Sequence, residues 1–111
     1  MTPLVAPIKG TAAIGYLKAV TKVEKETVVT TIRVKNLATG AIAGLKVEEF
    51  WWDKAGSPVG GSVDQLKKPL MPGETATFTL RTPKNPKMFS TNYRFSHANG
   101  QANAKLLDSL D

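Results

Sequence analysis

The amino-acid sequence predicts a single all-β domain made of two packed antiparallel sheets. Apolar and polar residues alternate with a period of two in several stretches, as on strands that have one buried face. Turn-forming residues recur about every ten residues, and no stretch shows the period of an amphipathic helix. A chain of 111 residues also falls in the usual size range of one domain.

Composition indicates a folded domain that is stabilised by burial of apolar side chains. Hydrophobic residues make up 41% of the chain and charged residues 22%, which is far from the composition of disordered chains. The sequence contains no cysteine. A disulfide framework, a thiolate metal site and a cysteine nucleophile are therefore excluded.

Two stretches show the alternation most clearly. In residues 27–37 every second side chain is apolar or threonine, and we expect this set to face the core: Val28, Thr30, Ile32 and Val34. The alternate set, which begins with Val29, is expected to face water. In residues 74–82, threonines and an arginine alternate with a second core-facing set: Ala76, Phe78 and Leu80.

Five further stretches complete a set of about seven strands: residues 9–21, 44–53, 58–62, 90–98 and 101–107. Turn chemistry separates them. Pro72-Gly73 suits the two central positions of a type II turn. Asn99-Gly100 tolerates the positive φ angles of a type I′ turn and predicts a hairpin between the last two strands.

Short strands at this spacing are typical of an immunoglobulin-like sandwich, and we predict an all-β, about seven-stranded antiparallel fold of that type. A closed barrel of about five or six strands is the alternative. We assign residues 1–8 to an N-terminal arm or linker, 9–107 to the sandwich and 108–111 to a C-terminal tail. Residues 104–111 fit either a helical turn or the end of a strand.

Several motifs resemble the bacterial immunoglobulin-like domains of the FxLYD type. They lie in residues 34–36, 44–47, 51–56, 70–74 and 78, and the resemblance covers roughly residues 10–107. Four residues agree with the family's turns: Asp53, Gly56, Pro72 and Gly73. In the motif that gives the family its name, Glu49, Trp51 and Trp52 stand where the family has F, L and Y, and only the aspartate is kept. The resemblance implies a β-sandwich without enzymatic activity, often in exported or surface-attached proteins, and it implies no particular ligand.

The sequence offers no catalytic or metal-binding candidate. His97 is the only histidine, which excludes a His-based metal site, and we interpret it as a surface or turn-capping residue. Glu48 and Glu49 are adjacent on a predicted strand, so their carboxyl groups point to opposite faces and cannot act as a pair. The glycine-rich loop 56–61 lacks the lysine of a phosphate-binding loop. We predict no enzymatic activity, no metal and no cofactor.

The net charge of +6 and the isoelectric point of about 9.7 suggest an anionic partner, but the distribution of charge argues against a nucleic-acid site. Glutamates interrupt the lysines of residues 18–26. Arg33 and Arg81 should lie toward opposite ends of two antiparallel strands. The basic loop 82–87 carries no aromatic side chain for base stacking. Nucleic acid is therefore not an expected partner.

Three consecutive aromatic residues, Phe50, Trp51 and Trp52, are the most unusual feature of the sequence. Strand geometry sends Trp51 to one face and the other two to the opposite face. Trp51 shares its side with two apolar residues of the same strand, so we expect it to be buried and Trp52 to be at least partly exposed. Glu49 interrupts that inward series, which a bulge or a salt-bridging partner would explain. Phe50 and Trp52 are the candidate binding residues.

These observations support two hypotheses of function. The first is a non-catalytic interaction or spacer module of a bacterial envelope or secreted protein. The alternative is a carbohydrate- or peptide-binding module that uses Phe50 and Trp52 as an aromatic platform. No apolar run is long enough to span a membrane, and residues 1–7 look like a boundary left when a leader or preceding region is removed. We expect an extracytoplasmic location and a protein or glycan partner, and the oligomeric state stays open.

Overall fold

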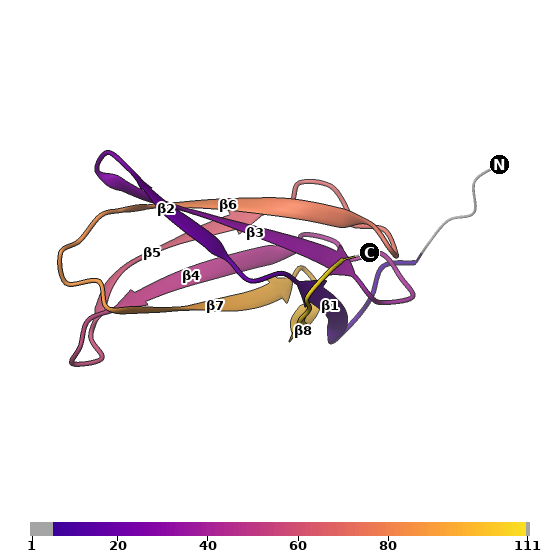
Figure 1. Ribbon diagram of the computed structural model, residues 1–111. Helices are drawn as coiled ribbons and strands as arrows, with labels where there is room; N and C mark the ends of the chain where they lie inside the picture. The colour runs from indigo at the N-terminus through magenta and orange to yellow at the C-terminus, as the bar shows by residue number, and fades with distance from the viewer. Residues whose placement is uncertain (1–5, 111) are drawn as a thin grey trace.

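The computed structural model describes residues 6–110, which form eight β-strands and no helix (Figure 1). The strands are β1 (Ala12–Tyr16), β2 (Val20–Glu24), β3 (Thr27–Asn36), β4 (Lys46–Trp52), β5 (Pro58–Gln65), β6 (Thr75–Pro83), β7 (Ser90–His97) and β8 (Gly100–Leu106). The prediction of an all-β chain is confirmed. Within this described range, no helix is long and apolar enough to cross a membrane.

The strands form one mixed sheet that curls over on itself into a half-barrel. Its order is β2-β3-β1-β8-β7-β4-β5, and β6 pairs with β3. Figure 1 shows two facing layers, with β2, β3 and β6 in the upper one, β4, β5 and β7 in the lower one, and β1 and β8 at one end.

One pairing departs from the predicted antiparallel arrangement, because β1 runs parallel to β8. The other ladders between described strands are antiparallel. A tight hairpin forces its two strands to be antiparallel, but β1 and β8 are the first and last strands and share no short turn. Their relative direction is set by how the sheet closes, which local sequence does not encode.

β3 organises the upper layer because both of its edges are used. β6 pairs along residues 27–35 of β3. β2 pairs with residues 27–31 and β1 with residues 34–36, so β1 and β2 share the second edge. The single strand predicted over residues 9–21 is therefore two strands, separated at residues 17–19, and the total is one more than predicted. β1 turns away there to pair with β8.

The core lies between the two layers, and the strand register fixes which side chains enter it. Ile32 lies opposite Phe78 and Thr30 lies opposite Leu80, and all four are buried. The predicted core-facing sets are thus confirmed, although Ala76 is only partly buried against the cluster.

Val29 is an exception to the predicted alternation. We expected it to face water, but only 4% of its surface is exposed. In the register it lies between Lys22 of β2 and Arg81 of β6. Long basic side chains cover apolar surface with their methylene stems while the charged ends stay in water, which explains a buried valine on an outer face.

The type II turn predicted at Pro72-Gly73 is present. The backbone N–H of Glu74 donates to the carbonyl of Met71 at 3.0 Å. Gly73 has a φ of 80°, which this turn requires at its third position. Residues 71–74 therefore lead directly into β6.

The hairpin predicted between the last two strands is also present, but its turn lies one residue earlier than expected. His97 pairs with Gly100, so the two loop residues are Ala98 and Asn99. Lys25 is the only non-glycine residue with positive φ among those described, so Asn99 does not adopt the type I′ conformation. Gly100 has a φ of 156°, and a Cβ atom there would overlap the carbonyl of Gly10. This contact shifts the turn, because the N-terminal segment crosses the hairpin.

Both ends of the described chain contact the domain. The N–H of Ile8 donates to the carbonyl of Ala41 at 2.7 Å, and Lys35 Nζ donates to the carbonyl of Leu110 at 3.0 Å. Residues 104–106 continue β8, and no helical turn follows before residue 110. The remainder of the predicted arm, residues 1–5, and the last residue of the tail, Asp111, lie outside the described residues.

Candidate functional site

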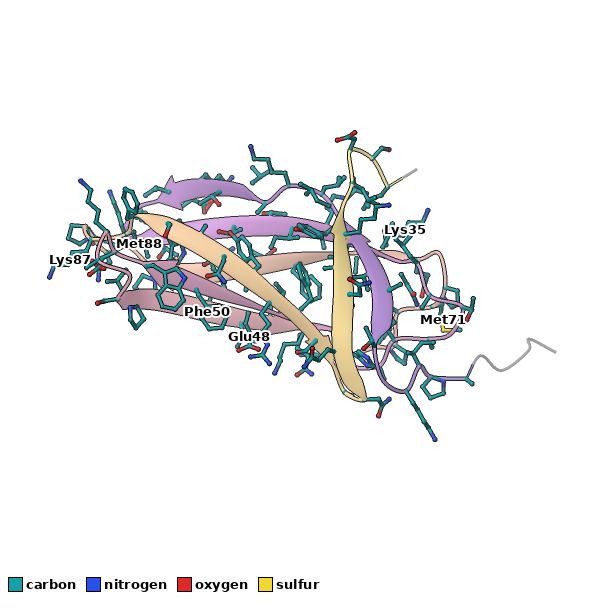
Figure 2. All side chains as sticks on the ribbon, turned by 90° about the horizontal axis from the view of Figure 1, so that it is seen from below. Lys35, Glu48, Phe50, Met71, Lys87 and Met88 are labelled. Atoms are coloured by element: carbon teal, nitrogen blue, oxygen red, sulfur yellow. The ribbon has the colours of Figure 1, made fainter. Side chains whose placement is uncertain are left out.

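The outer face of β4 carries the two candidate binding residues side by side. The rings of Phe50 and Trp52 stack with their centroids 6.2 Å apart and their planes at 25°. Both side chains are half-buried. Figure 2 shows the lower layer from outside, with Phe50 and Glu48 on this face. The structure therefore brings the two predicted residues together, and Trp52 is partly exposed as expected.

Neighbouring strands complete this surface, which we call the aromatic face (Phe50, Trp52 and Asn92). The indole Nε1–H of Trp52 donates to Oδ1 of Asn92 at 2.5 Å, and Asn92 lies directly opposite Phe50 on β7. On the β5 side Phe50 lies opposite Gly61, which has no side chain to cover the ring. The result is an apolar surface with an exposed amide group at its edge.

Trp51 points inward as predicted, but it is half-buried instead of buried. It lies opposite Thr91 of β7 and Gly60 of β5, and neither residue is large enough to enclose an indole. The register between β4 and β5 shifts immediately after Trp51. Its Nε1 atom is nevertheless shielded from solvent and has no hydrogen-bond partner.

Glu49 is a buried acidic residue that sequence alone could not explain. Only 1% of its surface is exposed. Its Oε1 accepts a hydrogen bond of 2.7 Å from the Thr82 hydroxyl, whereas Oε2 is shielded and has no partner. Among residues 6–110, ion pairs join Lys22 to Glu24 and Lys46 to Glu48, and none reaches Glu49. The salt-bridging partner considered above is therefore absent from the described residues, and the bulge lies two residues beyond Glu49.

Tyr93 lies directly opposite Glu49 on β7. Burial raises the pKa of Tyr93 above its ordinary value, and the negative charge of Glu49 raises this pKa further, while the nearby hydroxyls of Thr30 and Thr91 oppose the rise. The Tyr93 hydroxyl is shielded and makes no hydrogen bond of good geometry. We call Glu49, Trp51 and Tyr93 the polar cluster, because each carries a buried polar atom without a partner.

His97 is a turn-capping residue, as one of the two interpretations predicted, but it is buried and not at the surface. The N–H of Asn99 donates to His97 Nδ1 at 3.2 Å. Nε2 therefore carries the proton and donates to the carbonyl of Gly10 at 2.6 Å. Both ring nitrogens are used by the main chain, which leaves neither for proton transfer or metal binding.

Four basic residues share the outer face of the upper layer, because Arg33 and Lys35 have the same parity as Val29 on β3, and Lys22 and Arg81 lie opposite Val29. Arg33 lies opposite Thr77 and Arg81 opposite Val29, so the two arginines lie toward opposite ends of the β3–β6 ladder, as predicted. Glu48 points to the outer face, where it is paired with Lys46 at 3.9 Å. Within residues 6–110, no group of three or more His, Asp or Glu side chains is placed to hold a metal ion.

Comparison with known proteins adds information about the fold. No protein-family model matches the chain, and no curated protein matches its sequence. Among solved structures, IrmA from Escherichia coli is similar, with a TM-score of 0.56 and 12% sequence identity. The match covers 88% of this chain and 93% of the IrmA chain. At this identity the similarity shows a shared fold alone.

Proposed function

We infer that this chain is a non-catalytic binding module whose ligand is a glycan, bound on the aromatic face. The observation that carries this proposal is the stacked pair Phe50–Trp52, which is half-exposed on the outer face of β4. Aromatic rings offer a flat apolar surface, and Trp adds a polar tip. Here the exposed amide of Asn92 supplies further hydrogen-bonding groups beside the rings, as a hydroxyl-rich ring would require.

The position of β4 favours a glycan over a peptide. Peptides commonly bind sheets by adding a strand at a free edge. β4 has no free edge, because β5 pairs along one side of it and β7 along the other. A ligand at Phe50 and Trp52 must therefore bind to the face of the sheet through side chains. Flat sugar rings suit such a face, whereas strand addition by a peptide is blocked.

The location and the finer fold class belong to the same proposal. Asp53 accepts hydrogen bonds from the N–H groups of Ala55 and Ser57, and Pro72-Gly73 forms its turn, so the positions that resemble the FxLYD type have structural roles here. These turns and the two facing layers support an immunoglobulin-like sandwich from a bacterial envelope or secreted protein. A non-catalytic role is supported by the engagement of both His97 nitrogens with the main chain.

A pull-down assay with insoluble peptidoglycan, chitin and cellulose tests the proposal. The wild-type chain is expected to sediment with at least one of them, and Trp52→Ala and Phe50→Ala should each reduce the bound fraction about tenfold or more. Val20→Ala, an exposed apolar residue on β2 in the other layer, is the matched control. Equal retention of wild type and Trp52→Ala, or retention on none of the three, would contradict glycan binding and favour a spacer role.

A further inference from the structure

A second region with the features of a binding site lies between the layers, on the side away from β5. β2 pairs only with β3, and β7 pairs with β8 only at Ser96 and His97. The remaining edges of β2 and β7 are therefore unpaired among the described strands. Between them lies a slot of about 290 Å³, lined mainly by apolar groups.

The walls of the slot suit the apolar body of a small ligand. Ile32 of β3 lines it from the upper layer, and Tyr93 of β7 lines it from the lower layer. Leu106 of β8 also lines the slot, yet 57% of its surface is exposed. Covering such surface favours binding. The volume lies at the lower end of the range of small-molecule sites, which is about 300–1,000 Å³, so the slot suits a short alkyl chain.

The polar side chains of the slot indicate which head group it can hold. The hydroxyls of Thr21 and Thr91 are already hydrogen bonded within the chain, at 3.2 and 2.9 Å. The hydroxyl of Tyr93 is shielded from solvent. Of the lining residues, Tyr16 and Lys18 remain, and the phenol and the ammonium group can both donate a hydrogen bond. The slot therefore suits a head group that accepts hydrogen bonds.

Lys18 is the only charged residue that lines the slot. It lies two residues beyond the end of β1, in the connection to β2, and its side chain is exposed. Among residues 6–110, ion pairs join Lys22 to Glu24 and Lys46 to Glu48, and neither includes Lys18. An unneutralised positive charge thus lies at the mouth of an apolar slot, where it is available to an anion.

We propose that the slot binds a small alkyl carboxylate, with the alkyl chain between the layers and the carboxylate paired with Lys18 at the mouth. Because Lys18 is exposed, the carboxylate stays in contact with water and no charge is buried. The net charge of +6 attracts anions to the whole molecule. The experiment must therefore separate this general attraction from pairing with Lys18.

A ¹H–¹⁵N NMR titration with hexanoate, n-hexanol and n-hexylamine at neutral pH and low salt tests the proposal. Hexanoate should shift the amide signals of residues 16–21 and 91–93. It should bind about three- to fivefold more tightly than n-hexanol, as expected for a partly exposed ion pair, and n-hexylamine should bind more weakly than n-hexanol. Octanoate should bind about tenfold more tightly than hexanoate, because two more methylene groups leave water.

Lys18→Gln should lower the affinity for hexanoate to that for n-hexanol and leave n-hexanol binding unchanged, whereas Lys18→Arg should keep the preference for the anion. Lys22→Gln is the matched control. It removes the same charge from the chain, but Lys22 lies on the outer face of β2, opposite Val29. Leu106→Ala should weaken hexanoate and n-hexanol by the same factor, about threefold, because it removes apolar surface from the slot and no charge.

Two results would overturn the proposal. If hexanoate and n-hexanol bind equally well to the wild type, or if Lys18→Gln and Lys22→Gln weaken hexanoate binding equally, the slot does not recognise the anion. Amide shifts confined to residues outside the slot would show that the alkyl chain binds elsewhere. Glycan binding at Phe50 and Trp52 uses the outer face of β4, so each proposal can fail without the other.

Discussion

The two halves of the interior differ in chemistry although the same strands build both. Near β1 and β8, the inward residues are Leu45, which immediately precedes β4, and Val47 of β4, and both are fully buried. Two and four residues further along the same strand, the inward positions are Glu49 and Trp51. The inward residues of β6 change in the same way: Phe78 and Leu80 are apolar, whereas Thr82, further along the strand beside Glu49, is polar. We call these regions the apolar half and the polar half.

The difference teaches where stability and where function should lie. In the apolar half, burial of close-packed side chains stabilises the fold. In the polar half, three buried polar atoms lack partners, and each such atom costs free energy. Natural proteins retain costs of this kind mainly at functional sites. Substitutions should therefore have large effects on stability in the apolar half and small effects in the polar half.

The largest expected effect is that of Phe78→Ala in the apolar half. Phe78 is fully buried and lies opposite Ile32. Truncation of a buried phenylalanine should lower the free energy of unfolding by about 3–5 kcal/mol. Urea denaturation monitored by tryptophan fluorescence measures this loss. The control is Val63→Ala at an exposed position on β5, which should change the free energy of unfolding by less than about 0.5 kcal/mol. A similarly small loss for Phe78→Ala would show that the two halves do not differ in their contribution to stability.

Asn36→Ala tests whether a polar residue can stabilise the apolar half when its groups are paired. Asn36 is buried, and its Nδ2 donates to the carbonyls of Gly40 and Leu70 at 2.9 and 2.8 Å. Its Oδ1 accepts from the N–H of Ala38 at 2.7 Å. The substitution removes all three hydrogen bonds, although the Leu70 carbonyl keeps the one from the N–H of Ile42, and it should cost about 2–4 kcal/mol.

The control for Asn36→Ala is Asn92→Ala, which removes one exposed hydrogen bond to Trp52 and should cost about 1 kcal/mol or less. Both values come from urea denaturation. Equal losses for the two asparagines would mean that burial and multiple pairing of Asn36 contribute nothing special, which would contradict the role assigned to it.

Sequence alone predicted local features of this fold well. The alternation in β6, the type II turn at Pro72-Gly73 and the existence of the last hairpin depend on neighbouring residues, and all are confirmed. The opposite orientations of Phe50 and Trp51 also follow from strand geometry. Local periodicity was therefore sufficient for the strands and for the composition of the aromatic face.

Features that depend on distant contacts were not predicted. The break between β1 and β2 arises because β1 turns to β8, which is the last strand in the sequence. The burial of His97 depends on Gly10, 87 residues away in sequence. Glu49 was recognised as an anomaly, but its hydrogen-bond partner Thr82 and its cross-strand neighbour Tyr93 come from strands that only the tertiary structure places beside it.

Glu49→Met should have little effect on stability, in contrast to the two substitutions in the apolar half. It removes an unpaired buried carboxylate oxygen, and Thr82 Oγ1 keeps its hydrogen bond of 3.1 Å to Ser62. Replacing a buried charge by an apolar residue of similar volume is often neutral or stabilising. We expect a change within about 1 kcal/mol, in the stabilising direction, by urea denaturation.

Glu48→Met on the outer face is the control for the loss of a negative charge from the same strand. A loss above about 2 kcal/mol for Glu49→Met alone would show that the carboxylate is well paired in solution. Glu49 would then stabilise the fold through paired polar groups, as Asn36 does. The two halves would differ in the polarity of their side chains but not in how much they contribute to stability.

The smallest expected effect is a pH dependence that belongs to the polar half. The pKa of Tyr93 is raised in the folded chain by burial and by the charge of Glu49. Above the ordinary tyrosine pKa, the unfolded chain has lost this proton while the folded chain still holds it, so rising pH favours unfolding. The free energy of unfolding should fall as the pH rises from about 9 to about 11. The free energy of unfolding of the Tyr93→Phe variant should fall less over that interval than that of the wild type. Urea denaturation at each pH gives both slopes, and subtracting them removes the contribution of lysines that titrate in the same range. Equal slopes for wild type and Tyr93→Phe would show that the pKa of Tyr93 is not raised in the folded chain.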